Sequence, residues 1–74
     1  MQPIEKVGRA LYGEQWQAPL SRDLSVRKDT IGDFRQGRGE PGPGLYHDML
    51  DLAEKRMREL QEAIADLRRI LGVR

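Results

Sequence analysis

The sequence contains no cysteine and a single histidine, His47. A disulfide framework is therefore excluded, and a structural zinc site built from the usual cysteine and histidine ligands cannot be assembled. The chain has 74 residues, of which 38% are hydrophobic and 5% aromatic, so it has material for one small domain whose core is made of a few aliphatic side chains. Small domains without disulfides or metals are often completed by self-association. We therefore expect an oligomer that holds no metal and no other cofactor.

The chain also lacks long apolar runs and an excess of charge of one sign. No segment approaches the ~20 apolar residues that a membrane-spanning helix needs, so we expect a cytoplasmic protein with no membrane partner. Lys and Arg number 13 and Asp and Glu number 12, which gives a formal net charge of +1. A charge this small produces no overall field that attracts nucleic acid, so any argument for such a partner must rest on local charge.

Motifs of enzymatic chemistry are missing as well. Ser21 and Ser25 are the only serines, and neither lies in a nucleophile motif with a histidine to activate it. The glycine-rich stretch 37–44 is not followed by the Lys and Ser or Thr of a phosphate-binding loop. We predict that the protein is not an enzyme and has no small-molecule ligand.

Three short stretches, at residues 4–11, 16–24 and 31–36, have apolar residues three or four positions apart. This spacing is typical of amphipathic helices. Gly13 ends the first stretch, and residues 25–27 separate the second from the third. Because no segment alternates with the period of two that strands show, the pattern predicts an all-α head of three helices.

A longer helix is predicted after the head, which we define as residues 1–37. Glycine and proline dominate residues 38–44, which therefore form a loop. Neither residue type occurs from Leu45 to Leu71, so one helix about 40 Å long is expected there, with Gly72 as its C-terminal cap. The predicted organisation is a head at 1–37, a loop at 38–44 and a long helix at 45–74, together forming one compact domain.

One face of the long helix carries apolar residues at alternating steps of four and three. An average spacing of about 3.5 keeps these residues on one side of a supercoiling helix, which favours a dimeric coiled coil. We call this row the seam; it comprises Tyr46, Leu50, Ala53, Met57, Leu60, Ile64, Leu67 and Leu71. Leu50, Met57, Ile64 and Leu71 take the a positions of the heptad, and the other four take the d positions. The seam therefore predicts a homodimer.

The alternative is that the long helix folds back over its own head. A second apolar row, made of Leu45, Met49 and Leu52, lies beside the seam only near the start of the helix, and we expect it to contact the head. Three helices of roughly ten residues cannot cover about 40 Å of seam. The distal part would then stay in water, so the dimer is the preferred interpretation.

Residues 17–36 have the pattern of a helix-turn-helix unit, in which two short helices are joined by a three-residue turn. The second helix carries basic side chains, and Ser21 supplies a small residue where the two helices approach. The positions expected to be buried between them are Leu20, Leu24, Val26, Ile31 and Phe34.

This stretch resembles the lambda-repressor-like (Xre-type) helix-turn-helix regulators of bacteria and their phages. Those proteins have a Trp opening the second helix, then Leu-Ala-x-x-Leu-Gly-Val, then Thr-Val-x-x-Trp-x-x-Gly. Here Trp16 is followed at 20–26 by Leu-Ser-Arg-Asp-Leu-Ser-Val and at 30–37 by Thr-Ile-Gly-Asp-Phe-Arg-Gln-Gly. The chain departs from the pattern at Ser25, which replaces the glycine of the turn, so that a residue with a Cβ is expected to adopt a left-handed backbone there. It also departs at Arg27, which replaces a helix-capping residue.

The resemblance covers about residues 1–52 and implies a set of DNA-binding residues. The third helix would lie in the major groove of double-stranded DNA. The side chains placed to reach bases are then Arg27, Lys28, Asp29, Asp33 and Gln36, and those assigned to phosphates are Arg22, Arg35 and Arg38. Residues 27–38 contain four basic and two acidic residues, so the local balance is positive. The simpler alternative is that these are ordinary solvated surface charges.

Two functions follow as expectations. The first is a homodimeric, sequence-specific DNA-binding protein, a small transcriptional regulator associated with the nucleoid. The second is a protein-binding adaptor or inhibitor that acts through the long amphipathic helix and keeps only a vestigial helix-turn-helix. Acidic side chains facing DNA subtract from affinity, so Asp29 and Asp33 favour the second function.

Overall fold

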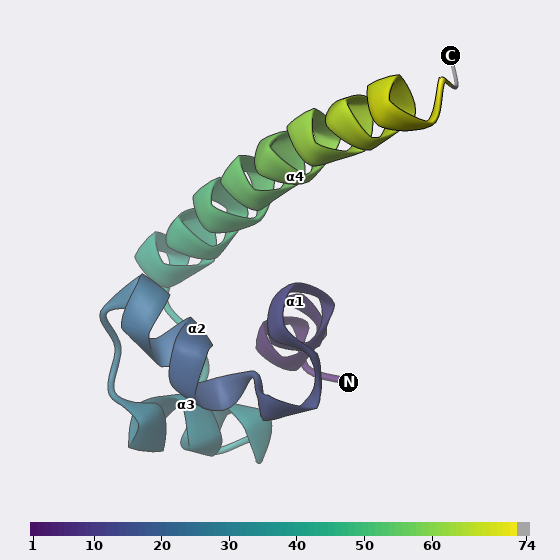
Figure 1. The fold of residues 1–74 in the computed structure, drawn as a ribbon. Coiled ribbons are helices and arrows are strands. Elements are labelled where there is room, and N and C mark those ends of the chain that lie inside the picture. Colours follow the sequence, from purple (N-terminus) through teal and green to yellow (C-terminus); the bar gives the residue numbers. More distant parts are fainter. Residues whose placement is uncertain (73–74) are drawn as a thin grey trace.

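The computed structural model describes residues 1–72, which form four α-helices and one short 3-10 helix (Figure 1). The elements are α1 (Pro3–Tyr12), η1 (Gly13–Gln15), α2 (Gln17–Leu24), α3 (Lys28–Arg35) and α4 (Pro43–Leu71). No strand occurs among the described residues. The prediction of an all-α protein is confirmed, and all four helices begin and end within a few residues of the positions that the sequence indicates.

The ends of α1 and α4 follow from residues with special backbones. Pro3 and Pro43 each lie in a first helical turn, where the missing amide hydrogen has no acceptor to lose. This explains why α4 begins before Leu45. Gly72 takes the left-handed conformation, with φ of 70°, and its N–H donates to the carbonyls of Arg68 and Arg69. The predicted C-terminal cap at Gly72 is therefore confirmed.

The core of the molecule lies between the head and the first turns of α4. Six apolar residues are buried there: Ile4, Trp16, Leu20, Leu24, Ile31 and Met49. Trp16, 1% exposed, packs directly on the backbone of Gly8 in α1. A Cβ atom at Gly8 would lie 2.2 Å from Cε3 of Trp16, so this close packing requires a glycine.

The first turns of α4 complete the core of the head. Met49 is only 2% exposed, and Leu45 and Leu52 are partly buried against the same cluster. The predicted contact between this row and the head is thus confirmed.

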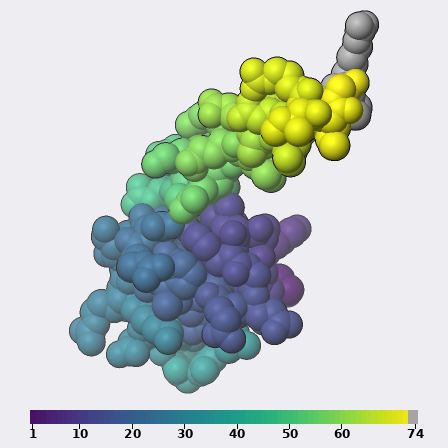
Figure 2. Space-filling view, in the orientation of Figure 1, coloured from purple at the N-terminus to yellow at the C-terminus, as the bar shows by residue number. Residues whose placement is uncertain are grey.

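Beyond these turns α4 leaves the head as a single rod, and the described residues extend over 49 × 23 × 20 Å (Figure 1). In Figure 2 the distal turns project beyond the packed head. Within one chain, the alternative in which the helix folds back along the head is therefore wrong.

A polar cluster joins α4 to the head. Arg56 donates from Nη2 to Oδ2 of Asp23 over 2.9 Å, and its guanidinium carbon lies 5.8 Å from the ring centroid of Tyr12. The Tyr12 hydroxyl also donates to Asp23. These hydrogen bonds, first from Tyr12 and then from Arg56, lower the pKa of the Asp23 carboxyl. Because one residue comes from each of α1, α2 and α4, the cluster joins three helices.

Candidate functional site

Residues 25–27 form a short turn between α2 and α3. Ser25 adopts a left-handed backbone, with φ of 55° and ψ of 41°. The N–H of Ser25 donates to the Arg22 carbonyl over 3.2 Å, and the N–H of Val26 donates to the Ser21 carbonyl over 2.9 Å. These bonds satisfy carbonyls at the end of α2 and turn the chain sharply into α3. The left-handed conformation expected at Ser25 is therefore present, in a residue that carries a Cβ.

Helix α3 has one apolar face and one polar face. Ile31 is fully buried in the core, and Phe34 packs against it. On the other side Lys28 and Asp29 are exposed, and Arg27, which precedes the helix, provides no side-chain cap. Anchoring by Ile31 and Phe34 therefore holds the polar face of α3 toward solvent.

The structure brings five of the eight residues predicted to contact DNA into one shallow hollow of about 430 Å³. These are Lys28, Asp29, Asp33, Gln36 and Arg38. Gly32 and Gln17 complete its wall. Gln17 is the first residue of α2. The sequence pattern does not identify Gln17 as a site residue, because only the turn between α2 and α3 brings it next to α3.

The other three predicted residues lie outside this hollow. Arg22 is exposed on α2. The side chain of Arg27 is 85% exposed and lies 3.8 Å from the Asp29 carboxylate. Nε of Arg35 lies 3.8 Å from Oε1 of Glu5, so Arg35 forms an ion pair with α1.

Ion pairs neutralise part of the charge on the polar face of α3. Nε and Nη2 of Arg38 donate to Oδ1 of Asp33 over 3.1 Å and 2.9 Å. With Arg27 near Asp29, both acids of α3 have an arginine partner from the same segment. Within residues 1–72, Lys28 has no ion-pair partner. Both acids therefore have an arginine within ion-pair distance, and Lys28 is a cation of this face that has no such partner within residues 1–72.

The seam on α4 is the second candidate surface. Its large side chains keep between 40% of their area, at Ile64, and 73%, at Leu71, in contact with solvent. Ala53, close to the head, is partly buried. Each of the residues 54–72 is exposed, so nothing in the described chain covers the distal seam.

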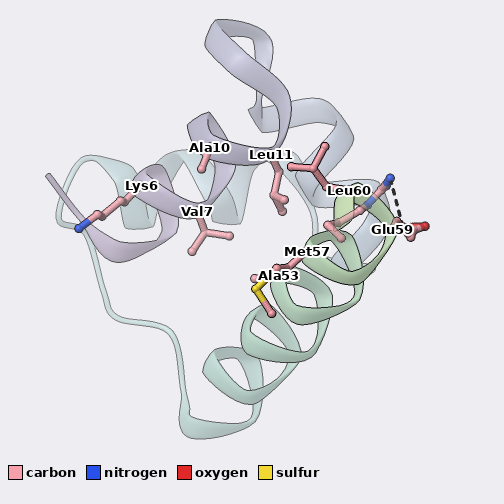
Figure 3. A pocket seen from close by; sticks show the side chains of 9 residues that line it. Lys6, Val7, Ala10, Leu11, Ala53, Met57, Glu59 and Leu60 are labelled. Carbon is pink, nitrogen blue, oxygen red and sulfur yellow. Dashed lines mark ion pairs between the residues drawn. The ribbon is translucent and has the colours of Figure 1, made fainter. Parts of the chain in front are cut away.

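A groove next to the seam extends this apolar surface onto α1. It has a volume of about 700 Å³, and its apolar lining consists of Val7, Ala10 and Leu11 of α1 and Ala53, Met57 and Leu60 of α4. The charged residues Lys6, Arg56 and Glu59 complete the lining. Figure 3 shows Val7 and Leu11 pointing from α1 toward α4. The apolar spacing of Ile4, Val7 and Leu11 predicts one buried face of α1. It does not show that Val7 and Leu11 line a groove while Ile4 is buried in the core.

Other kinds of site are not found in the described residues. His47 lies exposed on α4, and residues 1–72 hold no group of His, Asp and Glu side chains placed to bind a metal ion. None of the helices in that range is both long enough and apolar enough to span a membrane. No protein-family model, curated protein or solved structure matches this chain.

Proposed function

We propose that this protein is a homodimeric, sequence-specific DNA-binding protein, a small transcriptional regulator that places α3 in the major groove of double-stranded DNA. The observation that carries the proposal is the α2–turn–α3 unit. Its sharp turn and the buried Ile31 present a short helix whose outer face is entirely polar. A helix held in this way is the element that helix-turn-helix proteins insert into the major groove.

The residues of the hollow have complementary tasks in this proposal. Gln36 is suited to an adenine edge, and Lys28 to guanine or phosphate. Asp29 and Asp33 accept hydrogen bonds from cytosine amino groups or orient their arginine partners. Arg27 reaches a base from the start of α3, while Arg22, Arg35 and Arg38 contact the backbone on either side.

Dimerisation through the seam supplies the second half of the site. Two copies present two α3 helices to half-sites one helical turn of about 34 Å, or a multiple of it, apart on a pseudo-palindromic operator. The exposed seam supports this step, because each large side chain left in water forgoes about 1.5–3 kcal/mol of burial. The protein would then act in the cytoplasm, on the nucleoid, and its own concentration would set its occupancy.

A gel-shift series with the double variant Arg27→Ala, Lys28→Ala tests the DNA-binding face. An operator is first selected from a genomic library with the tagged protein. Removing two cations that meet DNA should weaken binding at least tenfold and lower the slope of log affinity against log salt by up to about 1.8. The control is Lys55→Ala, Arg58→Ala, which removes the same charge from the exposed side of α4 and should leave both quantities unchanged. Equal loss in both variants, or no loss in either, would reject α3 as the DNA-binding helix.

The alternative, a protein-binding adaptor or inhibitor that acts through α4, has one observation in its favour. Asp33 holds Arg38 with two hydrogen bonds, which withdraws a cation from DNA. Absence of any duplex binding at low salt, with the dimer intact, would favour this function over the first.

A further inference from the structure

The groove between α1 and the seam sits beside only one edge of the seam. In the heptad numbering, the g positions flank the seam on the side of α1, and the e positions flank it on the opposite side. The groove includes Arg56, a g residue, but no e residue. Any helix that pairs with the seam therefore also meets α1 along the g edge.

The two edges of the seam differ in chemistry. The e row is polar throughout and consists of His47, Glu54, Gln61 and Arg68. The g row is Met49, Arg56, Ala63 and Ile70. Met49 is buried in the head, and Arg56 is held by Asp23 and Tyr12, so the apolar part of this row that remains free is distal. Ile70 is 79% exposed, the second-highest value among the large apolar side chains. A distal apolar edge therefore exists on the same chain as a proximal apolar groove.

We propose that two copies pair along the seam in antiparallel orientation, so that Ile70 of each copy enters the groove between α1 and α4 of the other. The proposal deepens the proposed dimer and rests on it. It extends the dimer interface to α1, through Val7, Ala10 and Leu11.

Orientation follows from which edges meet. In a parallel pair, the g edge of one helix faces the e edge of the other. The groove would then face Glu54 and Gln61 of the second copy, and Ile70 would remain in water. In an antiparallel pair, g faces g and e faces e, which brings the second copy's Ala63 and Ile70 to the side of α1. The antiparallel pair therefore places apolar groups against the groove and leaves the polar e rows together at the other edge.

The groove also selects the register. Only Ile70 is a bulky apolar residue on the free part of the g row, so it is the side chain of that row that can cover the apolar wall of the groove. Ile70 lies opposite the groove when Ala53 of one copy faces Leu71 of the other. A shift by one heptad toward the head would place Ile70 against Met49, which is already buried. The resulting layers are Ala53 with Leu71, Met57 with Leu67, and Leu60 with Ile64, each occurring twice.

Charge complementarity on the e edge supports the same register. It sets Glu54 of each copy opposite Arg68 of the other, which gives two attractive pairs per dimer. At the centre of the overlap, Gln61 of one copy faces Gln61 of the other. Tyr46 and Leu50 lie outside the overlap, so they contribute less to pairing than the distal seam does.

Engineered cysteines test the orientation, and the absence of native cysteine removes any background. Two single variants, Met57→Cys and Leu67→Cys, are prepared separately, mixed, dissociated and reassociated, and then oxidised. We expect the mixture to form a disulfide that joins residue 57 of one chain to residue 67 of another, identified by peptide mass spectrometry. Neither variant alone should be cross-linked, because in this register each cysteine lies far from its counterpart. A disulfide requires Cα atoms within about 7 Å.

The possible outcomes separate this inference from the proposed function. Cross-linking of Leu67→Cys with itself would show a parallel dimer, which overturns the inference and leaves the dimer standing. A dimer in which no pair is cross-linked would overturn the register. A monomer by sedimentation would overturn both the inference and the proposed dimer, while gel shifts with the unmodified protein report on DNA binding independently.

A second variant pair tests the groove without disulfide chemistry. Ile70→Ser should raise the dissociation constant of the dimer at least tenfold, because the apolar contact of this side chain with the groove is lost. Gln61→Ser changes a residue of the polar e row and should alter that constant less than threefold. Equal values for the two variants would contradict the entry of Ile70 into the groove. Circular dichroism on both checks that the helix content is unchanged.

Discussion

The head and the distal half of α4 contain similar apolar residue types but bury them differently. All six buried apolar residues lie between positions 4 and 49, whereas every residue from 54 to 72 is exposed. In the head, three short helices and the start of α4 cover one another. Beyond Arg56, the ion pairs that the described part of the distal helix forms are local, such as that of Arg69 with Asp66. Isolated helices are marginally stable in water, so the proposed dimer would give the distal helix the packing that the head already finds within one chain.

The largest effect on the proposed dimer is expected from the double variant Leu60→Asp, Ile64→Asp, which places charges in the distal seam. A dimer would lose the burial of four large side chains, each worth about 1.5–3 kcal/mol, so its dissociation constant should rise by more than about 10⁴. Sedimentation should then show a monomer. Fluorescence of Trp16 should keep the emission of a buried indole, because Trp16 packs on Gly8 in a core that does not include the distal seam.

The matched control is Ala65→Asp, which adds a carboxylate on the outward face of the same turn and should leave the dimer intact. Unchanged sedimentation of the double variant would contradict the seam as the dimer interface. Loss of the Trp16 signal would contradict a head that folds without the pairing.

Substitutions at two glycines, one packed and one not, test the packing of the head. Gly8→Ala places a Cβ against the indole of Trp16, and such overpacking costs about 1–3 kcal/mol or more, which outweighs the ~1 kcal/mol that alanine adds to a helix. Gly32→Ala makes the same change in α3, where the new Cβ has no neighbour within 4 Å apart from the backbone of its own helix and its two chain neighbours. It should raise stability by up to about 1 kcal/mol. Urea denaturation of both variants checks the opposite signs, and a loss at Gly32 as large as that at Gly8 would contradict the packing described for Trp16.

Local patterns predict the helices well because apolar spacing and Gly or Pro act over one or two turns. The left-handed Ser25 and the burial of Met49 are predictable for that reason. The ion pairs of Arg35 with Glu5 and of Arg56 with Asp23 are not, because they depend on the angles between helices. The groove beside the seam is missed for the same reason: it exists only once α1 is placed against α4. The DNA contacts and the dimer stay predictions.

The smallest effect is expected from the cluster that joins the two regions. Hydrogen bonds from Tyr12 and Arg56 make the pKa of Asp23 lower in the folded than in the unfolded chain. Its contribution to stability is therefore present above the unfolded pKa of about 3.9 and is lost as the pH falls through the lower folded value. Asp23→Asn should lower the thermal midpoint slightly at pH 7 and remove part of its decline below pH 4. Melting curves from pH 7 to pH 2 for both proteins measure this difference. A gap between the curves that persists undiminished at pH 2 would mean that the carboxylate charge does not hold α4 to the head.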